Sequence, residues 1–296
     1  MKLDYIARAT ALDGRVRAFA LTATGVVAEL QSRHRMNPVP TAAVGRTAMG
    51  ALLLSAASLK ERDQILTVEV KGDGPLGRII CTANGAGEVR GLAANPFVHA
   101  PSVAPGKLNV AGVVGTRGYI SVTKDLGLRD TYKGTVELQS GEIGEDLAFY
   151  LARSEQTPSA VGLGVFVLPD GSVEAAGGFL VQLLPGLDDS EVAAIEREIS
   201  SLPHPTTMIR EGLPPEGLLT RIFPGGYELL DTFGVRFECP CSRERFEAAL
   251  ITLGSEELSK IIEEEERDFT ELVCHFCNEA YHFTASDMRG ILRAAS

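Results

Sequence analysis

Four cysteines near the C-terminal end of the sequence have the spacing of a metal site. One residue separates Cys239 from Cys241, 32 residues follow, and two residues separate Cys274 from Cys277. Four thiolates in two close pairs can surround one Zn²⁺ as a tetrahedron. Because a shell closed by four sulfurs leaves no position for water or substrate, such a metal stabilises a fold and does not catalyse a reaction.

The first cysteine pair leaves a second interpretation open. Only Pro240 separates Cys239 from Cys241, whereas zinc ligands of a finger are usually about two to four residues apart. Sulfurs held in close pairs can also lose the metal and form disulfides when their thiolates are oxidised. From these residues alone, a static zinc module and a redox switch both stay open.

Composition limits the class of protein and its partners. The chain has 296 residues, 45% of them hydrophobic, which is enough for one larger and one smaller domain. Its net charge of −11 disfavours binding to nucleic-acid phosphates or to anionic lipid. Charges interrupt the stretch Met1–Arg8, and no later stretch has the ~20 apolar residues of a membrane span. We therefore expect a cytoplasmic protein that acts without nucleic acid and without a membrane.

The remaining candidates for chemistry are weak. Cytosolic thiols are kept reduced, so the four-cysteine group indicates metal binding or reactivity and not permanent disulfides. Cys81 lies in an apolar run and is predicted to be an inert buried thiol. His275 and His282 lie near the second pair, but four sulfurs already complete a zinc shell. No other pattern indicates a nucleophile or a catalytic base, so we predict no catalytic site and no enzyme activity.

The first part of the chain predicts an α+β domain of antiparallel strands with packed helices. Residues 3–22 indicate a hairpin around Asp13-Gly14, a pair suited to positive φ. Helices are expected over 24–35 and over 41–60, the second with Thr41 as N-cap and with a small-residue face that packs against a sheet or a second subunit. Further elements are a helix over 144–155, strands over 159–184, and a series of short strands at 66–70, 78–82, 88–92, 108–112, 119–123 and 135–138.

One turn in this region matches a nucleotide-binding pattern. Residues 72–77 read Gly-Asp-Gly-Pro-Leu-Gly and follow a strand, as the dinucleotide fingerprint requires. That fingerprint must also open a helix whose N-terminus binds pyrophosphate, but residues 78–82 have the composition of a strand. We interpret the motif as a hairpin turn.

The character of the chain changes after residue 180. An acidic helix is expected over 188–201, and prolines and apolar side chains alternate up to about residue 230. A soluble protein must keep those apolar side chains covered. The last 66 residues carry 14 acidic and 7 basic side chains, the opposite of a nucleic-acid finger, and include two expected helices at 242–252 and 255–266.

These residues resemble a known family along essentially the whole chain. The Cys239-Pro240-Cys241 and Cys274-His275-Phe276-Cys277 motifs, together with residues 72–77, Ser154-Glu155-Gln156 and Ala176-Gly177-Gly178, are similar to the bacterial 33 kDa heat-shock protein family. Members of that family are redox-regulated holdase chaperones, which are inactive when reduced and zinc-bound. Oxidants and mild unfolding stress together activate them.

The resemblance implies roles for particular residues and segments. Cys239, Cys241, Cys274 and Cys277 would bind one Zn²⁺ per chain, and oxidation would pair Cys239 with Cys241 and Cys274 with Cys277. Residues 1–180 would form the core domain, 181–230 a helical metastable linker, and 231–296 the zinc-binding redox-switch domain. The implied partners are unfolding client proteins and a second copy of the chain in a homodimer.

Two functions of other classes compete with this one. A thiol-disulfide oxidoreductase using Cys274 and Cys277 would need a thioredoxin-like helix N-terminus, and the acidic surroundings disfavour the thiolate it requires. A zinc-dependent adaptor would act constitutively. Protection of a client that begins on oxidation and ends on reduction would distinguish the switch from both.

Overall fold

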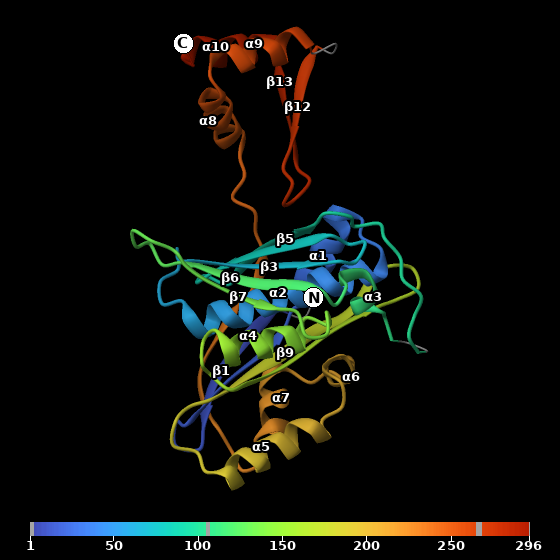
Figure 1. Cartoon of the computed structure of the whole chain (residues 1–296), viewed down its shortest axis with the longest axis vertical. Coiled ribbons are helices and arrows are strands. Elements are labelled where there is room, and N and C mark those ends of the chain that lie inside the picture. The colour runs from blue at the N-terminus through green and yellow to red at the C-terminus, as the bar shows by residue number, and fades with distance from the viewer. Residues whose placement is uncertain (1–2, 105–106, 265–267, 296) are drawn as a thin grey trace. The chain divides into compact units, whose positions relative to one another are not determined.

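The computed structural model describes residues 3–104, 107–264 and 268–295. It divides into two compact units, Met1–Glu238 and Cys239–Ser296 (Figure 1). The first unit contains two mainly antiparallel sheets with packed helices, and the second contains a small hairpin with helices. The predicted α+β class is therefore confirmed. The segment 181–230, predicted to be a linker, belongs to the first compact unit.

The first sheet has the strand order β10-β1-β2-β9-β8. Strands β1 and β2 form the predicted hairpin, and Asp13 and Gly14 in its turn have φ of 54° and 79°. Tyr5 in β1 lies opposite Gly234 in β10 and Thr10 lies opposite Glu228, so the chain returns to this sheet at residue 228. The strands are β1 (Tyr5–Ala11), β2 (Val16–Thr22), β8 (Ser159–Val167), β9 (Val173–Leu183) and β10 (Glu228–Gly234).

The second sheet has the strand order β11-β5-β4-β3-β6-β7. Neighbouring strands pair antiparallel, except that β11 pairs with β5 in parallel over Arg236 and Phe237. Residues 228–237 thus pair first with one sheet and then with the other. The strands are β3 (Ile65–Gly72), β4 (Arg78–Asn84), β5 (Glu88–Ala93), β6 (Gly118–Asp125), β7 (Tyr132–Glu137) and β11 (Arg236–Phe237).

The strand predicted over 108–112 is wrong, because a short helix, α3 (Val110–Val114), occupies this position. The side chain of Asn109 accepts a hydrogen bond from the Gly112 amide at 2.9 Å. Such an N-cap stabilises the first turn of a helix, and this local bond decides against the strand.

The 72–77 segment is a turn, as interpreted from the sequence, and it packs against the end of α3. The amides of Gly74 and Leu76 donate hydrogen bonds to the carbonyls of Val114 and Val113, both at 2.9 Å. A Cβ on Gly74 would lie 2.3 Å from the Val113 oxygen. Glycine is therefore required here by the close approach of two backbones and not by a phosphate.

Helix α2 (Pro38–Ser58) lies between the two sheets (Figure 1). It begins at Pro38 and not after Thr41 as predicted, since proline is favoured at the first helical position. A Cβ on Gly45 would lie 2.8 Å from Val27 Cγ1 of α1 (Thr24–His34) and 3.0 Å from Val165 Cγ2 of β8. The predicted packing of the small-residue face against a sheet is confirmed.

Among the described helices, α2 alone has the length and apolar composition of a membrane span, and its burial in the core accounts for both.

Three helices of the predicted linker cover the outer face of the first sheet (Figure 1). They are α5 (Asp189–Ser201), α6 (Pro205–Arg210) and α7 (Pro215–Ile222). Because side chains alternate across a strand, every second residue of β1 and β2 points toward these helices, and most are alanines that let the helices approach closely. The sheet side of this cluster is Ala7, Ala9, Ala11, Val16, Ala18, Ala20, Phe179 and Val181, and the helix side includes Ile195, Met208, Leu218, Leu219, Ile222 and Phe223.

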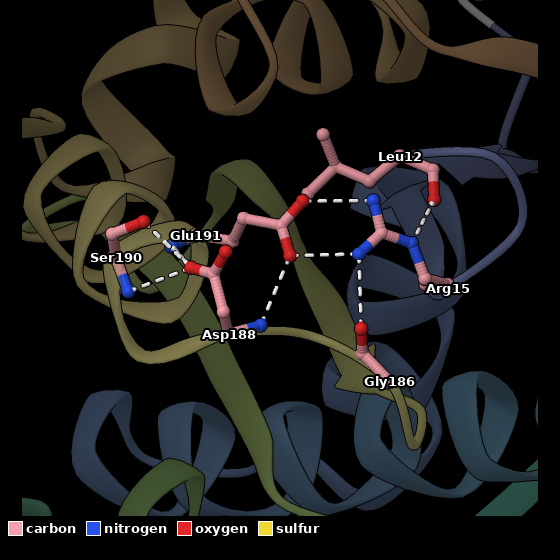
Figure 2. Close-up of polar contacts among 6 residues, drawn as sticks. All are labelled: Leu12, Arg15, Gly186, Asp188, Ser190 and Glu191. Carbon is pink, nitrogen blue, oxygen red and sulfur yellow. Dashed lines mark hydrogen bonds and ion pairs between the residues drawn. The ribbon is translucent and has the colours of Figure 1, made fainter.

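Polar contacts hold the start of α5. Arg15, in the β1–β2 hairpin, donates to both carboxylate oxygens of Glu191 at 2.7 Å and to the Gly186 carbonyl at 3.0 Å (Figure 2). Asp188 caps the helix by accepting from the amides of Ser190 and Glu191, each at 2.9 Å. The Arg15 contact lowers the pKa of Glu191. Of the residues described in α5, Ile195 alone is buried, so this helix depends on the arginine more than α7 does.

Replacing Arg15 should therefore loosen α5 selectively. In Arg15→Gln, hydrogen exchange should accelerate over 189–201 because the paired hydrogen bonds to Glu191 are lost, while β1 and β2 keep their protection. The matched control is Arg117→Gln, since the Arg117 side chain is 91% exposed in the bend just before β6, far in sequence from α5. Equal exchange over α5 in both variants would show that apolar packing alone holds this helix.

His204 caps α6 with its imidazole. Its Nδ1 lies 2.8 Å from Thr206 Oγ1 and accepts from the Thr206 amide at 3.4 Å, and a Cβ on Gly164 would lie 2.7 Å from His204 Cε1. Burial lowers the pKa of His204, and the cations Arg46 and Lys107 lower it further against the opposing effect of Glu142. The packed helix thus favours the neutral ring, whose Nδ1 can accept a hydrogen bond.

The α6 region should consequently loosen in acid. A depressed pKa means that the stabilisation is complete above the unfolded value of about 6.5 and is lost as pH falls from there through the lower folded value. Hydrogen exchange over 204–210, corrected for intrinsic rates, should accelerate between about pH 7.5 and about pH 5.5. In His204→Asn, which keeps a capping acceptor without a titrating ring, that acceleration should disappear. Its persistence in the variant would assign the pH effect to another group.

Candidate metal centre

The structure brings the four predicted cysteines together. Their Sγ atoms all lie within 4.8 Å of one another. Cys239 and Cys274 are 3.7 Å apart at sulfur, and Cys241 and Cys277 are 3.3 Å apart. Tetrahedral zinc with Zn–S bonds of about 2.3 Å has sulfurs about 3.8 Å apart. The donor set and its dimensions therefore fit one zinc ion.

Two segments far apart in sequence supply the sulfurs. Cys239 and Cys241 precede α8 (Arg243–Leu253), whose N-cap Ser242 accepts from the Arg245 amide at 3.3 Å. Cys274 and Cys277 lie in the turn between β12 (Phe269–Val273) and β13 (Ala280–Thr284). The hairpin register thus places one pair of sulfurs, and the extended chain before α8 places the other.

The turn between β12 and β13 is built around Cys274. Its carbonyl accepts from the amides of Cys277 at 3.3 Å and Asn278 at 2.7 Å, and its own amide donates to the Glu279 carbonyl at 2.9 Å. Asn278 has φ of 56°, a left-handed conformation that asparagine tolerates. The amides of Phe276 and Cys277 also bond to the Cys274 sulfur. These bonds direct the turn backbone toward the metal position.

Burial works against thiolates at this position. Cys274 and Cys277 are only 7% and 3% exposed, whereas Cys239 and Cys241 are half-buried. Desolvation raises the pKa of both Cys274 and Cys277. Four thiolates in an acidic module repel one another and their surroundings, so a bound cation is needed to stabilise them. The cluster therefore has the chemistry of a metal centre and not of a free reactive thiol.

The unit around the cysteines has a small apolar core. It also contains α9 (Ser255–Glu264) and α10 (Ala285–Ala294). The predicted helices 242–252 and 255–266 correspond to α8 and α9, although residues 265 and 266 lie outside the described part of the chain. Its described buried core is Leu250, Leu258, Phe283, Met288 and Ile291. A core of this size stabilises a fold weakly, and a metal ion could supply the difference.

The two nearby histidines are not part of the four-atom group. His275 is exposed within the cysteine turn, and the group that could hold a metal consists of sulfurs alone. His282 lies 2.7 Å from Glu271 Oε2 and packs edge-on against Phe269. Their assignment as bystanders is consistent with these positions.

Sequence reasoning missed one residue of the site, Tyr281. Its hydroxyl donates a hydrogen bond to Cys241 Sγ at 3.3 Å, and its ring lies 4.9 Å from that of Phe246 between centroids. The bond to Cys241 raises the pKa of Tyr281, which therefore stays protonated as a donor. In the sequence this tyrosine is only an aromatic residue of a short strand, and nothing there links it to Cys241.

The chain is similar to known proteins along nearly its whole length. The sequence model of the Hsp33 protein family matches residues 4–284. The chain belongs to the Hsp33 family. It is 47% identical to the 33 kDa chaperonin of Bacillus subtilis over 98% of both chains, and 44% identical to that of Latilactobacillus sakei, again over 98% of both. The crystal structure of the Thermotoga maritima 33 kDa chaperonin superposes with a TM-score of 0.89 at 36% identity and covers 98% of each chain. The resemblance stated from the sequence is confirmed.

The metal centre predicts the effect of removing single sulfurs. Cys241→Ser and Cys277→Ser should each lose tightly bound zinc, and the second unit should unfold, because structural zinc contributes about 10–16 kcal/mol of apparent binding free energy. Metal analysis and hydrogen exchange over 239–296 measure both effects.

The control is Cys81→Ser. Burial raises the pKa of the Cys81 thiol, which lies 3.7 Å from the Val44 carbonyl in the core of the first unit. This variant should keep its zinc and its response to oxidants. Zinc that stayed tightly bound in both Cys241→Ser and Cys277→Ser would rule out the four-sulfur site.

Proposed function

We propose that this protein is a redox-regulated holdase chaperone that binds unfolding proteins under combined oxidative and thermal stress. Membership of the Hsp33 family supports a chaperone, and its relatives carry the name chaperonin. The observation that carries the redox part is the gathering of four sulfurs in a module with a small core. We place the protein in the cytoplasm, without enzyme activity, as a homodimer that contacts neither nucleic acid nor membrane.

In the reduced state, Cys239, Cys241, Cys274 and Cys277 hold one Zn²⁺ as thiolates. Bound zinc supplies positive charge to the thiolates and cross-links α8 to the β12–β13 turn. This cross-link keeps the module folded, and the linker helices stay on the alanine-rich face of the first sheet. Both apolar surfaces are then covered, so the resting protein does not bind clients.

Oxidation removes the ligands. Within each pair, Cys239 with Cys241 and Cys274 with Cys277, two thiolates give up two electrons to a peroxide. An S–S bond forms, the O–O bond breaks, and the two oxygens leave as water after taking up protons. Disulfide sulfurs are poor metal ligands, so the module loses the contribution that offset its chain entropy and unfolds.

Unfolding of the module then frees the linker. Strand β11 connects the first unit to Cys239. Its register with β5 covers Arg236 and Phe237, and the Glu238 amide adds one hydrogen bond to the Val89 carbonyl at 3.0 Å. So short a pairing opens readily once the following chain is disordered. The linker helices keep their own packing until mild heat overcomes it. The uncovered face of the first sheet and the apolar side of α7 then become available to clients.

An aggregation assay tests the function. Peroxide treatment at raised temperature should make the protein suppress aggregation of a thermally unfolding client, and dithiothreitol should reverse this effect. Zinc content measured on the same samples should fall as protection appears. Protection without oxidation would favour a constitutive adaptor, and turnover of client disulfides would favour a thiol-disulfide oxidoreductase.

Hydrogen exchange tests the order of events. After oxidation, protection should fall first over 231–296 and then, on warming, over 181–230, while the rest of the first unit stays protected. Client binding with 181–230 still fully protected would contradict linker release. It would indicate that clients bind the unfolded module itself.

A further inference from the structure

The hydrogen bond from Tyr281 to Cys241 distinguishes this sulfur from Cys274. The backbone amides of Phe276 and Cys277 bond to the Cys274 sulfur, and no side-chain substitution removes a backbone amide. The donor to Cys241 is a side-chain hydroxyl at 3.3 Å. Cys241 is also half-buried, whereas Cys274 is buried, so dissolved oxidants can approach Cys241 more closely.

The position of the tyrosine is set by structure on both sides. In the β12–β13 hairpin it pairs with Leu272, next to the turn that carries Cys274 and Cys277. Its ring packs against Phe246 of α8, the helix that directly follows Cys241. The hydroxyl is thus held toward Cys241 by the same two segments that supply the sulfurs.

We propose that Tyr281 is a positioning residue that slows the reaction of Cys241 with electrophiles and peroxides by donating a hydrogen bond to its thiolate. This inference rests on the proposed zinc-bound resting state. A thiol that coordinates a metal is already deprotonated, so the hydroxyl is not needed to form the thiolate. The hydrogen bond from Tyr281 instead makes the lone pair of the Cys241 sulfur less available, because a stabilised thiolate is a weaker nucleophile.

The reaction that Tyr281 slows is the oxidation of Cys241. The Cys241 lone pair attacks a peroxide oxygen, an S–O bond forms and the O–O bond breaks, which gives a sulfenic acid and, after proton uptake, water. A neighbouring thiolate, proposed above to be Cys239, then displaces hydroxide from the sulfenic sulfur to form the disulfide. With the hydroxyl in place, Cys241 reacts only when the oxidant concentration is high.

Site-resolved alkylation of the zinc-loaded full-length protein tests this role. In Tyr281→Phe, iodoacetamide should label Cys241 about 2- to 12-fold faster, the range expected for loss of one hydrogen bond. Peptide mass spectrometry should show unchanged labelling rates at Cys239, Cys274 and Cys277. Zinc transfer to a chelator without oxidant should also be unchanged, while the oxidation of Cys241 by peroxide accelerates.

The matched control is Tyr119→Phe, which removes a hydroxyl that bonds to Glu69 on the second sheet and should leave every cysteine rate unchanged. A second variant carries 3-fluorotyrosine at position 281, a stronger donor with the same ring, and should label Cys241 more slowly than the wild type. This opposite shift keeps the test valid if Tyr281→Phe disturbs the fold.

Three results would overturn the role of Tyr281. The first is an unchanged or slower labelling of Cys241 in Tyr281→Phe. The second is an equal acceleration at all four cysteines together with faster zinc loss to the chelator. The third is faster labelling of Cys241 in the fluorotyrosine variant. A wild-type protein that kept its zinc in peroxide would instead contradict the proposed switch. The alkylation pattern would still decide the role of Tyr281.

Discussion

The convergence of four sulfurs within 4.8 Å of one another is the constraint on which the rest of the second unit depends. Burial and acidic surroundings oppose thiolates, and the apolar core beside them is small. A metal ion bound by these sulfurs would stabilise the fold, and the chemical state of the sulfurs would then be coupled to the folded state of the module. Cysteine is suited to this coupling because its oxidised form cannot serve as a ligand.

The first unit has a different balance of interactions. Its core lies around α2, which is buried between the two sheets, and this packing does not depend on the cysteine cluster. The linker helices are held by a smaller apolar cluster and by local polar contacts from Arg15 and His204. The alanine-rich sheet face brings the helices close but offers each of them little apolar area. Helices α5, α6 and α7 therefore belong to the less stable part of the first unit.

The half-buried pair and the buried pair of sulfurs give the cluster an internal asymmetry. Backbone amides stabilise Cys274, whereas a side-chain hydroxyl contacts Cys241. Hydrogen bonds of both kinds lower the nucleophilicity of a thiolate, but only a side-chain donor can be changed by substitution. A site can thus keep its metal affinity while its sensitivity to oxidants is adjusted at one position.

The sequence by itself determined the features that depend on neighbouring residues. Cysteine spacing predicted the four sulfurs that the structure brings together, and Asp13-Gly14 identified the hairpin turn. The strand-like residues after 72–77 excluded a nucleotide fingerprint. The sequence was also misinterpreted locally, since the strand predicted over 108–112 is a helix whose first turn is capped by Asn109. Only the tertiary structure decided which distant residues meet, such as Tyr281 with Cys241, Arg15 with Glu191 and His204 with Gly164. Such contacts depend on strand register and on how helices lie on a sheet, and both are set by packing between segments far apart in the chain.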